Sequence, residues 1–465
     1  MRLLPRADFA PLGELAAHRQ RLWSQQRAYV REHSALYRHA WAGYDVPDSL
    51  DDLVALPLVD KEILRASQRE HPPFGAYLAS SPDAVRRVHR TGGTTGEAMN
   101  LALSAADADD TAEVGARAQR ASGLGPGDVV VHCLNYQLWM GGFTDHTTLE
   151  ATGATVVPFG VGNPQLLVRT IRELGATAIS CTPSYPAVLE QVLAEEGITP
   201  RDLGLRLGLF GGEAALDVPG FRSRLEHTWG FAARNSNYGV TDIMCNFAGQ
   251  CQDQDALHFM AMDVLHPELI DADGSPLPWA SGVAGELVLT HMARDCQPLG
   301  RFRTGDIVTL ESVDPCACGR TAPRLRVTGR ADDMVVVRGV NVFPTSVAAR
   351  VTADPGLSGE FRILLRGGGP YDRLPLEVER ARDVDEPWED IRARVEAAAR
   401  ADLRVTAEVS VLDFGALPRT EGKTRRVVRM SEEEAGCLRF SPRTEVRCGS
   451  SPSTAPSDSM PSPSS

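Results

Sequence analysis

The sequence predicts an α/β protein in which a large N-terminal domain of stacked sheets and helices precedes a smaller C-terminal α/β domain. The chain has 465 residues, 43% of them hydrophobic, which is enough for two or three domains with their own cores. From Val85 to about Pro315, short β-branched segments alternate with helical segments rich in Ala and Glu. After Asp332 the chain changes to a shorter strand–helix–strand pattern, so a domain boundary is expected there.

The secondary-structure elements follow from local composition. Residues 1 to about 80 are charged and helix-like, and Leu15, Leu22 and Tyr29 recur on one helical face, so we expect helices packed on the outside of the large domain. The predicted strands are 129–133, 154–158, 176–181, 205–210, 335–337 and 409–412, and the predicted helices are 164–174, 185–196 and 389–403. We therefore predict domains at 1–331 and 332–438, followed by a disordered Ser/Pro-rich tail at 439–465.

Charge and composition exclude several classes of function. A formal net charge of −13 argues against a protein that tracks a nucleic-acid backbone, which concentrates positive charge. The N-terminal segment lacks the apolar core of a signal peptide, and no run approaches the ~18 apolar residues that span a membrane. Nine cysteines in such a chain are expected to be reduced thiols. We predict a cytoplasmic monomer or homodimer that binds small molecules or proteins, with no nucleic-acid or membrane partner.

The first motif with chemical content is a Gly/Thr-rich loop at residues 91–97. Its glycines let the backbone approach an anion closely, and its hydroxyl groups add donors to the backbone amides. No Gly-Lys-Ser/Thr closes it, so it is not a Walker loop, and a plain turn is the alternative interpretation. The residues predicted to bind phosphate are Thr91, Gly92, Gly93, Thr94, Thr95 and Gly96.

The second motif is Asn237-Tyr-Gly-Val-Thr-Asp242. An aromatic residue and a glycine followed by a hydroxyl and a carboxylate can stack on a purine, hydrogen-bond a phosphate and ligate Mg²⁺, which prefers oxygen. A loop before a helix would have the same composition. The residues predicted to act are Asn237, Tyr238, Gly239, Thr241 and Asp242.

Two further motifs are Arg301-Phe-Arg-Thr-Gly-Asp306 and Gly329-Arg-Ala-Asp-Asp-Met334. A carboxylate such as Asp306 can accept both hydroxyls of a ribose, and Arg330 can donate to the same sugar or to a phosphate. A single aspartate is more often a turn residue, but the two motifs together are hard to explain as turns.

These motifs, in this order, resemble those of adenylate-forming enzymes, and residues 335–344 closely match the phenylacetate-CoA ligase branch. The resemblance extends from Val85 to Val428. It implies that the Gly/Thr loop handles the β- and γ-phosphates of ATP, that Gly212 and Glu213 contact adenine and line the acyl pocket, and that Asp242 binds magnesium. It also implies a hinge at Asp332, which makes the C-terminal domain mobile.

The resemblance extends to a C-terminal motif that ends in Lys423. It implies that this lysine contacts the substrate carboxylate and the α-phosphate during adenylation. The chain departs from the family at two positions: Glu97 replaces a lysine beside the triphosphate, and Asp242 replaces a glutamate on magnesium. Glu97 is therefore expected to weaken the phosphate contacts unless it points away or helps to hold the metal.

The family builds part of its acyl pocket where this chain has Tyr136, Trp139, Gly141 and Gly142. Aromatic side chains next to glycines suit a flat ring, so an aromatic acid is the expected substrate, although both aromatic residues could simply belong to the core. His146 is either a polar handle there or a structural histidine.

A second metal site is expected at Cys251, His258, Cys316 and Cys318. Structural zinc sites are tetrahedral and rich in sulfur, which fits three thiolates and an imidazole, although the Cys-(any)-Cys spacing is tighter than in common zinc fingers. Several phenylacetate-CoA ligases resemble this chain in that arrangement. The expected role is structural, because four protein ligands leave no open position.

The resemblance implies a two-step reaction that uses ATP, Mg²⁺ and CoA. The acid attacks the α-phosphate to give an acyl-adenylate and pyrophosphate, and a thiol then takes the acyl group. Three alternatives remain: transfer to a carrier-protein phosphopantetheine or to an amine, activation of a non-carboxylate oxyanion, and a catalytically weak nucleotide-binding protein.

Overall fold

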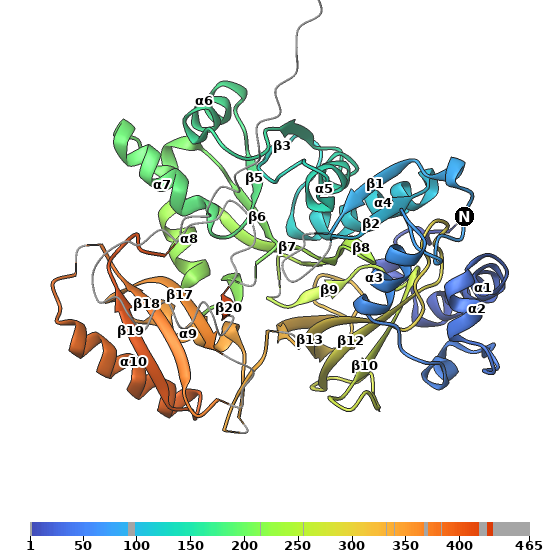
Figure 1. Cartoon of the computed structure of the whole chain (residues 1–465). Helices are drawn as coiled ribbons and strands as arrows, with labels where there is room; N and C mark the ends of the chain where they lie inside the picture. The colour runs from blue at the N-terminus through green and yellow to red at the C-terminus, as the bar shows by residue number, and fades with distance from the viewer. Residues whose placement is uncertain are drawn as a thin grey trace, which may run out of the picture.

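The computed structural model describes residues 2–91, 98–213, 215–253, 255–331, 333–338, 340–366, 371–382, 384–417 and 426–430. These residues form the mixed α/β fold that the sequence predicts (Figure 1). The main sheet has twelve strands in the order β11-β10-β12-β13-β14-β9-β8-β7-β6-β5-β3-β4, and a separate four-stranded sheet has the order β19-β18-β17-β20.

One half of the main sheet is parallel. Its strands are β3 (Val129–His132), β4 (Thr155–Pro158), β5 (Ala178–Cys181), β6 (Leu207–Gly211) and β7 (Ala232–Val240). The first four confirm the predicted strands, with ends that differ by one or two residues. The strand ends were predicted less accurately because flanking residues such as Ala176 and Leu205 are apolar but lie just outside the strands.

Helices cover both faces of this parallel half. The predicted helices α6 (Pro164–Leu174) and α7 (Tyr185–Glu196) are confirmed residue for residue, and α8 (Phe221–Trp229) completes their layer. The layer on the opposite face contains α4 (Ala105–Ser122) and α5 (Met140–Glu150). Neighbouring residues of one strand enter different cores: Val131 packs with α6 and α7, whereas Val130 packs with Leu149 of α5. This alternation is expected of a strand buried on both faces.

The other half of the main sheet is antiparallel, which corrects one prediction. The strand–helix alternation expected up to about residue 315 ends at α8, and the described residues between Ala232 and Arg330 form no helix. The connections between these strands are too short for the crossover helices that parallel strands need. The strands are β8 (Met244–Gln250), β9 (Leu257–Phe259), β10 (Leu265–Ile270), β11 (Pro276–Leu277), β12 (Ala284–His291), β13 (Phe302–Ser312) and β14 (Arg324–Arg330).

The N-terminal helices lie on the outside of the large domain, as predicted. They are α1 (Leu12–His33), α2 (Ala35–Ala40) and α3 (Lys61–Glu70). An antiparallel pair of strands, β1 (Arg87–Arg90) and β2 (Asn100–Leu103), follows them in the chain. Leu15 and Leu22 of α1 are buried, and the half-buried Tyr29 donates its hydroxyl to the Asp295 carbonyl at 2.9 Å. Short 3₁₀ helices occur at Ala7–Phe9, Leu50–Ala55, Pro82–Ala84, Pro200–Leu203 and Ala215–Asp217.

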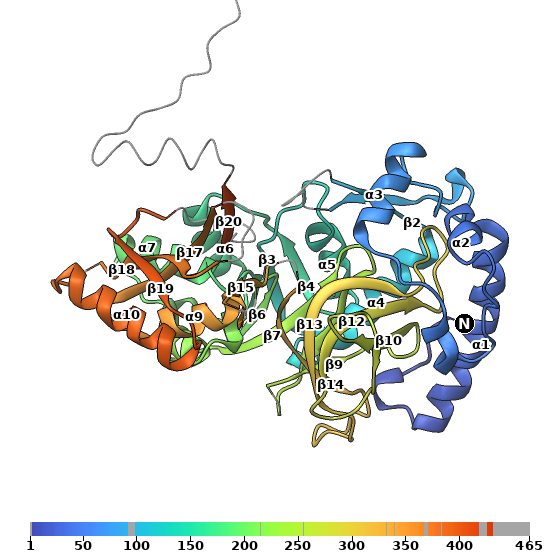
Figure 2. The same cartoon turned by 60° about the horizontal axis from the view of Figure 1, so that its bottom comes forward.

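The C-terminal unit has its own hydrophobic core, drawn from residues 335 to 427. Its elements are β15 (Val335–Val337), β16 (Val340–Val342), α9 (Pro344–Ala353), β17 (Leu357–Arg366), β18 (Leu374–Arg380), α10 (Trp388–Asp402), β19 (Ala407–Leu412) and β20 (Val427–Met430). This confirms the three elements that the sequence predicted there. The C-terminal unit and the N-terminal helices lie at opposite ends of the molecule in both views (Figures 1 and 2).

The connection between the two units runs from β14 to β15. The Thr345 hydroxyl at the start of α9 donates to the Thr328 carbonyl of β14 at 2.7 Å, so the units touch beside this connection. The predicted hinge, Asp332, lies outside the described residues, as does the tail at 439–465, so the hinge and the domain boundaries stay predictions. No helix in the described part of the chain is long and apolar enough to cross a membrane.

Candidate active site

Three strands of the main sheet bring the nucleotide motifs together. β7 carries Tyr238, β13 carries Asp306 and β14 carries Arg330. One oxygen of the Asp306 carboxylate accepts a hydrogen bond from the Tyr238 hydroxyl at 2.8 Å, and the other accepts one from Arg330 Nη1 at 2.6 Å. Residues that are far apart in sequence therefore form one hydrogen-bonded cluster around a single carboxylate.

The Tyr238 side chain is held in place on two sides. Its ring packs edge-on against Phe247, with ring centroids 5.0 Å apart. Burial, reinforced by the Asp306 carboxylate, raises the pKa of the Tyr238 phenol well above its usual value. The hydroxyl is therefore protonated at neutral pH and acts as the donor to Asp306.

Gly239 is required by the close pairing of β7 and β8. A Cβ at this position would lie 2.0 Å from the Cys245 carbonyl oxygen, so a side chain would push the two strands apart. At the end of β6, a Cβ on Gly211 would lie 2.7 Å from the Cβ of Asn237. Glycine at both positions thus fixes the carboxyl ends of β6 and β7, where the predicted nucleotide residues stand.

Asp242 follows β7 and forms an ion pair that the sequence did not predict. Its Oδ2 accepts a hydrogen bond from Lys61 Nζ at 3.0 Å, across the boundary between the sheet and α3. Lys61 and Lys423 are the only two lysines in a chain that otherwise uses arginine. That scarcity is the signal that could have drawn attention to Lys61. Thr241, next to Asp242, is half-buried.

The surroundings of Asp242 fit a magnesium ion. Asp242 is 5% exposed, and its Oδ1 has no hydrogen-bond partner within the described ranges. A buried carboxylate oxygen without a donor is costly, and Mg²⁺ is bound through such oxygens in combination with substrate phosphates. Asp242 would be the residue that holds it.

The Gly/Thr loop begins at Thr91, directly after β1. Thr91 closes the base of the loop, because its backbone N–H donates to the Met99 carbonyl and its hydroxyl accepts from the Met99 N–H, both at 3.0 Å. The remaining loop residues, Gly92, Gly93, Thr94, Thr95, Gly96 and Glu97, lie outside the described residues. So does Lys423, although the buried Leu417 before it is anchored by an N–H···O bond to Glu379 at 2.9 Å.

Gly212 and Glu213 follow β6. Gly212 has a φ of +83°, a left-handed conformation that favours glycine. The Glu213 carboxylate accepts hydrogen bonds from the Ser184 hydroxyl at 3.1 Å and from the Ser184 N–H at 3.3 Å. Glu213 therefore carries its charge at the N-terminus of α7, where the helix dipole favours an anion. Its contact with adenine stays a prediction.

The residues predicted to line the acyl pocket gather at the N-terminus of α5. A Cβ on Gly141 would lie 2.9 Å from the Trp139 ring, and a Cβ on Gly142 would lie 2.2 Å from the Asn135 carbonyl oxygen. Close packing alone therefore explains why both positions are glycine, without a contact to substrate. The Tyr136 hydroxyl and His146 Nδ1 are 3.0 Å apart, so His146 is tied to a predicted pocket residue. The contact of these residues with substrate stays a prediction.

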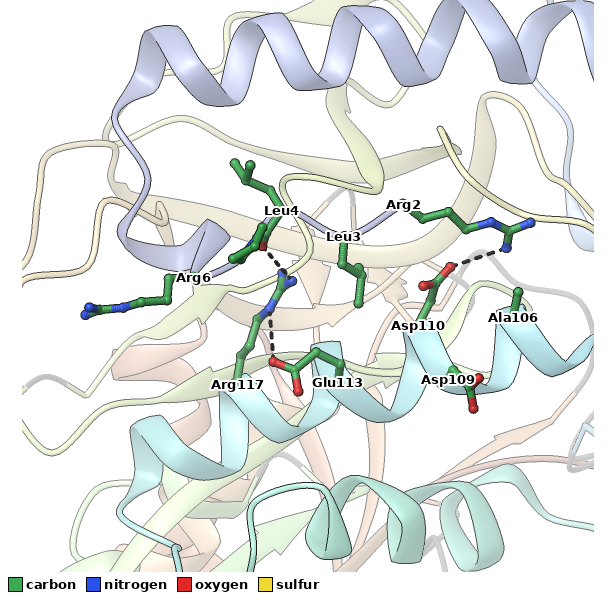
Figure 3. A pocket seen from close by; sticks show the side chains of 10 residues that line it. Arg2, Leu3, Leu4, Arg6, Ala106, Asp109, Asp110, Glu113 and Arg117 are labelled. Carbon is green, nitrogen blue, oxygen red and sulfur yellow. Dashed lines mark hydrogen bonds and ion pairs between the residues drawn. The ribbon is translucent and has the colours of Figure 1, made fainter.

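A groove of about 490 Å³ lies elsewhere, between the N-terminal residues and α4 (Figure 3). Ion pairs and hydrogen bonds hold its walls together: Arg2 pairs with Asp110 at 3.3 Å, and Arg117 donates to the Leu4 carbonyl at 3.3 Å. None of the nucleotide motifs lines it, so we place the candidate active site at the cluster of Tyr238, Asp306 and Arg330 instead.

The four candidate zinc ligands come together although they are far apart in sequence. Their ligand atoms all lie within 4.8 Å of one another, with Cys251 Sγ 4.0 Å from Cys316 Sγ and Cys318 Sγ 3.6 Å from His258 Nε2. Tetrahedral zinc with sulfur and nitrogen ligands implies ligand–ligand distances of roughly 3.5–3.8 Å. The donor set therefore fits zinc; the two quoted distances are close to the tetrahedral values, and the cluster as a whole is somewhat wider.

The histidine of this cluster is prepared for metal binding. His258 Nδ1 lies 3.0 Å from the Ala322 carbonyl oxygen, which fixes the proton on Nδ1 and leaves Nε2 as the ligand atom. Burial lowers the pKa of His258 to about 4, so the imidazole is neutral at pH 7. A neutral imidazole is the form that binds a metal.

Comparisons with known proteins identify the family of the chain. The AMP-binding enzyme C-terminal domain family matches residues 339–430. A phenylacetate-coenzyme A ligase of Thermus thermophilus is 32% identical over 448 residues, which cover 91% of this chain and 98% of the relative. A solved 2-hydroxyisobutyryl-CoA ligase in its postadenylation state superposes with a TM-score of 0.85 at 29% identity and 94% coverage of both chains. In its thioesterification state, with CoA, the same ligase superposes with a TM-score of 0.67 at 30% identity and the same coverage. The identity and coverage of these relatives show that this chain belongs to the phenylacetate-CoA ligase family.

Proposed function

We propose that the protein uses ATP to convert a carboxylic acid to an acyl-adenylate, with release of pyrophosphate, and then transfers the acyl group to the thiol of CoA. The observation that carries this proposal is the cluster of Tyr238, Asp306 and Arg330, which holds one buried carboxylate of β13 and one guanidinium of β14 beside the carboxyl end of β7. In open α/β sheets this is the edge at which ligands bind. Family membership and the postadenylation state of the solved relative, in complex with R3-HIB-AMP, support the same reaction.

The first step is attack of an acid oxygen on the α-phosphorus of ATP. A new P–O bond forms, the bond to pyrophosphate breaks, and negative charge grows on the phosphate oxygens. Asp306 would accept the ribose hydroxyls, while Arg330 keeps that carboxylate in place. Lys423 would lie between the acid and the α-phosphate, and magnesium bound at Asp242 would neutralise phosphate charge. No side chain needs to act as a nucleophile.

The second step is attack of the thiol on the acyl carbon, which releases AMP. We propose that the C-terminal unit turns about Asp332 between the steps, so that Lys423 is withdrawn and another face meets CoA. The fit to the solved relative falls from a TM-score of 0.85 to 0.67 between its two states, which supports a change of arrangement of this kind.

Pyrophosphate release with a panel of acids, with and without CoA, tests the function. We expect release that depends on an acid, and CoA consumption that matches it in amount. Release without CoA consumption would point to a carrier protein or an amine as the acceptor. No release with any carboxylic acid would contradict the proposal and leave the oxyanion and nucleotide-binding alternatives.

Lys61 would compensate for the missing loop lysine. Glu97 stands where the family has a cation, and Lys61 holds its ammonium 3.0 Å from Asp242, beside the proposed magnesium position. We expect Lys61→Ala to slow adenylation about tenfold, because one partly exposed charge near phosphate is worth roughly 1–2 kcal/mol. The measurement is pyrophosphate release at saturating acid across an ATP titration.

The matched variant is Lys61→Arg, which keeps the charge and is expected to retain most of the rate. Equal loss in both variants would mean that Lys61 acts through packing of α3 rather than through charge. An unchanged rate in Lys61→Ala would remove Lys61 from the phosphate site.

We also propose that Cys251, His258, Cys316 and Cys318 hold one structural zinc ion, which pins the loop before β14 to the segment between β8 and β9. The predicted result is about one zinc per chain by elemental analysis, retained on dialysis, because closed thiolate sites bind tightly. We expect Cys316→Ser to lower both the zinc content and the melting temperature. Cys133→Ser, which changes another buried thiol, should leave the zinc content unchanged. Protein purified without chelator that contains no zinc would contradict the site.

A further inference from the structure

Asp145 on α5 is a buried carboxylate that the mechanism above does not use. It is 3% exposed, and within the described residues its carboxylate is bonded by Asn237 and Cys245 rather than by a lysine, arginine or histidine. Its Oδ2 accepts a hydrogen bond from Asn237 Nδ2 of β7. Its Oδ1 has no N–H or O–H donor in the described part of the chain, and the weakly donating thiol of Cys245 lies beside the carboxylate.

Burial of the ionised Asp145 carboxylate costs desolvation free energy in the protein without a ligand. Burial raises the pKa of Asp145 to about 7, and the two hydrogen bonds from Cys245 and Asn237 offset only part of that effect. With this pKa the carboxyl group is ionised only in part at neutral pH, and in the ionised form Oδ1 lacks a strong donor that would offset its desolvation penalty. A ligand that brought an N–H or O–H to Oδ1 would remove that penalty.

Asp145 lies where the proposed acyl pocket meets the strand ends. Residues four apart lie on the same face of a helix, so Asp145 shares a face with Gly141. Its partner Asn237 pairs in register with Gly211, the last residue of β6. The carboxylate therefore stands between the glycine-rich start of α5 and the carboxyl edge of the parallel strands, which is the edge where ligands bind.

Another buried polar group of this region already has its partners. His132 at the end of β3 lies 3.1 Å from the Ser180 hydroxyl and 3.0 Å from the Gly142 carbonyl oxygen, so both ring nitrogens are used. The Asp145 carboxylate, in contrast, can still accept a hydrogen bond at Oδ1.

We propose that Asp145 is a specificity-determining residue whose Oδ1 accepts a hydrogen bond from a hydroxyl or amino group on the acyl part of the substrate acid. The proposal rests on the proposed function and narrows its substrate class from aromatic acids in general to acids that carry such a donor. A site built to hydrogen-bond a substrate hydroxyl or amine rejects the analogue without it, because its own polar atom is then left unpaired.

The test compares matched acids with the full-length enzyme. Pyrophosphate release is measured with phenylacetate and benzoate, and with each of their ring-hydroxylated and ring-aminated isomers. We expect at least one donor-bearing isomer to have a kcat/KM at least tenfold above that of its unsubstituted parent. A wild-type enzyme that shows no such preference among acids that do react would overturn the role of Asp145 while leaving the proposed function standing. Absence of release with any acid would overturn both.

Variants then assign the preference to the residue. Asp145→Ala is expected to lower kcat/KM for the preferred acid at least tenfold and to change that of the parent acid less than about twofold. Thr147→Ala, on the same helix, removes a local hydroxyl-to-carbonyl bond and should leave the ratio unchanged. Asp145→Asn is the substitute if the alanine variant does not fold. It keeps the shape and one acceptor oxygen, so we expect the ratio of kcat/KM for the preferred acid to that for its parent to be intermediate. Equal loss for both acids would overturn the proposal, and a weakened ATP affinity alongside it would mean that Asp145 only supports Asn237.

Discussion

Replacing Lys423 with alanine is expected to slow acyl-adenylate formation about 10²- to 10⁴-fold, because one positive charge is removed from a position where negative charge grows in the transition state. The second half-reaction should be largely intact, since the proposed rotation withdraws this lysine before the thiol attacks. The two half-reactions can be measured separately, the first as pyrophosphate release and the second as thioester formation from supplied acyl-adenylate and CoA.

Two controls accompany this variant: a conservative substitution, and a labelling experiment that is possible because the chain has two lysines. Lys423→Arg keeps the charge and should recover part of the first half-reaction, although the guanidinium differs in shape from the ammonium. Because Lys61 is the only other lysine, an amine-reactive reagent labels at most these two side chains and the N-terminus, and mass spectrometry can follow protection of Lys423 by ATP and acid. Equal loss of both half-reactions in Lys423→Ala would remove Lys423 from its assigned role.

Asp306→Ala is expected to weaken ATP binding about a hundredfold or more. The ribose would lose two hydrogen bonds to a charged acceptor, each worth roughly 1.5–3 kcal/mol, and about 1.4 kcal/mol corresponds to a factor of ten. The substitution also leaves Arg330 Nη1 and the Tyr238 hydroxyl without the carboxylate that they bind in the structure. The measurement is the dissociation constant of ATP by calorimetry.

Two further variants distinguish loss of the ribose contact from a non-specific effect of removing a carboxylate. Asp306→Asn keeps the shape and one acceptor oxygen, so its loss of affinity should lie between those of the wild type and the alanine variant. Asp273→Ala changes an exposed carboxylate in the turn before β11 and should bind ATP as the wild type does. Unchanged ATP affinity in Asp306→Ala would exclude Asp306 from the ribose site.

Local sequence patterns predicted the elements whose cause is itself local. α6 and α7 were predicted residue for residue because Pro164 and Pro186 mark their first turns and Gly175 and Gly197 end them in the left-handed conformation. The antiparallel half of the sheet was not separated from the parallel half, because β-branched segments look alike in both. What distinguishes them is the partner strand, which the segment itself does not specify.

The active-site motifs were recognisable because each is contiguous and its residue types are restricted. The glycines at 211 and 239 have a tertiary reason, however, since only the approach of Asn237 and of the Cys245 carbonyl leaves no room for a Cβ. The pairing of Lys61 with Asp242 and of Asp145 with Asn237 joins positions that no local pattern connects.

The sequence by itself predicted the α/β class from composition and periodicity along the chain, and it predicted the nucleotide motifs and the candidate zinc ligands from residue type, spacing and the family resemblance. Only the tertiary structure decided which side chains meet. The Asp306 carboxylate is bound by residues from two other strands, the four zinc ligands converge within 4.8 Å, and Asp145 is buried with an oxygen that lacks a strong donor. The physical reason is that hydrogen bonding, metal binding and desolvation depend on distance in space, which the packing of helices and strands sets and the distance along the chain does not.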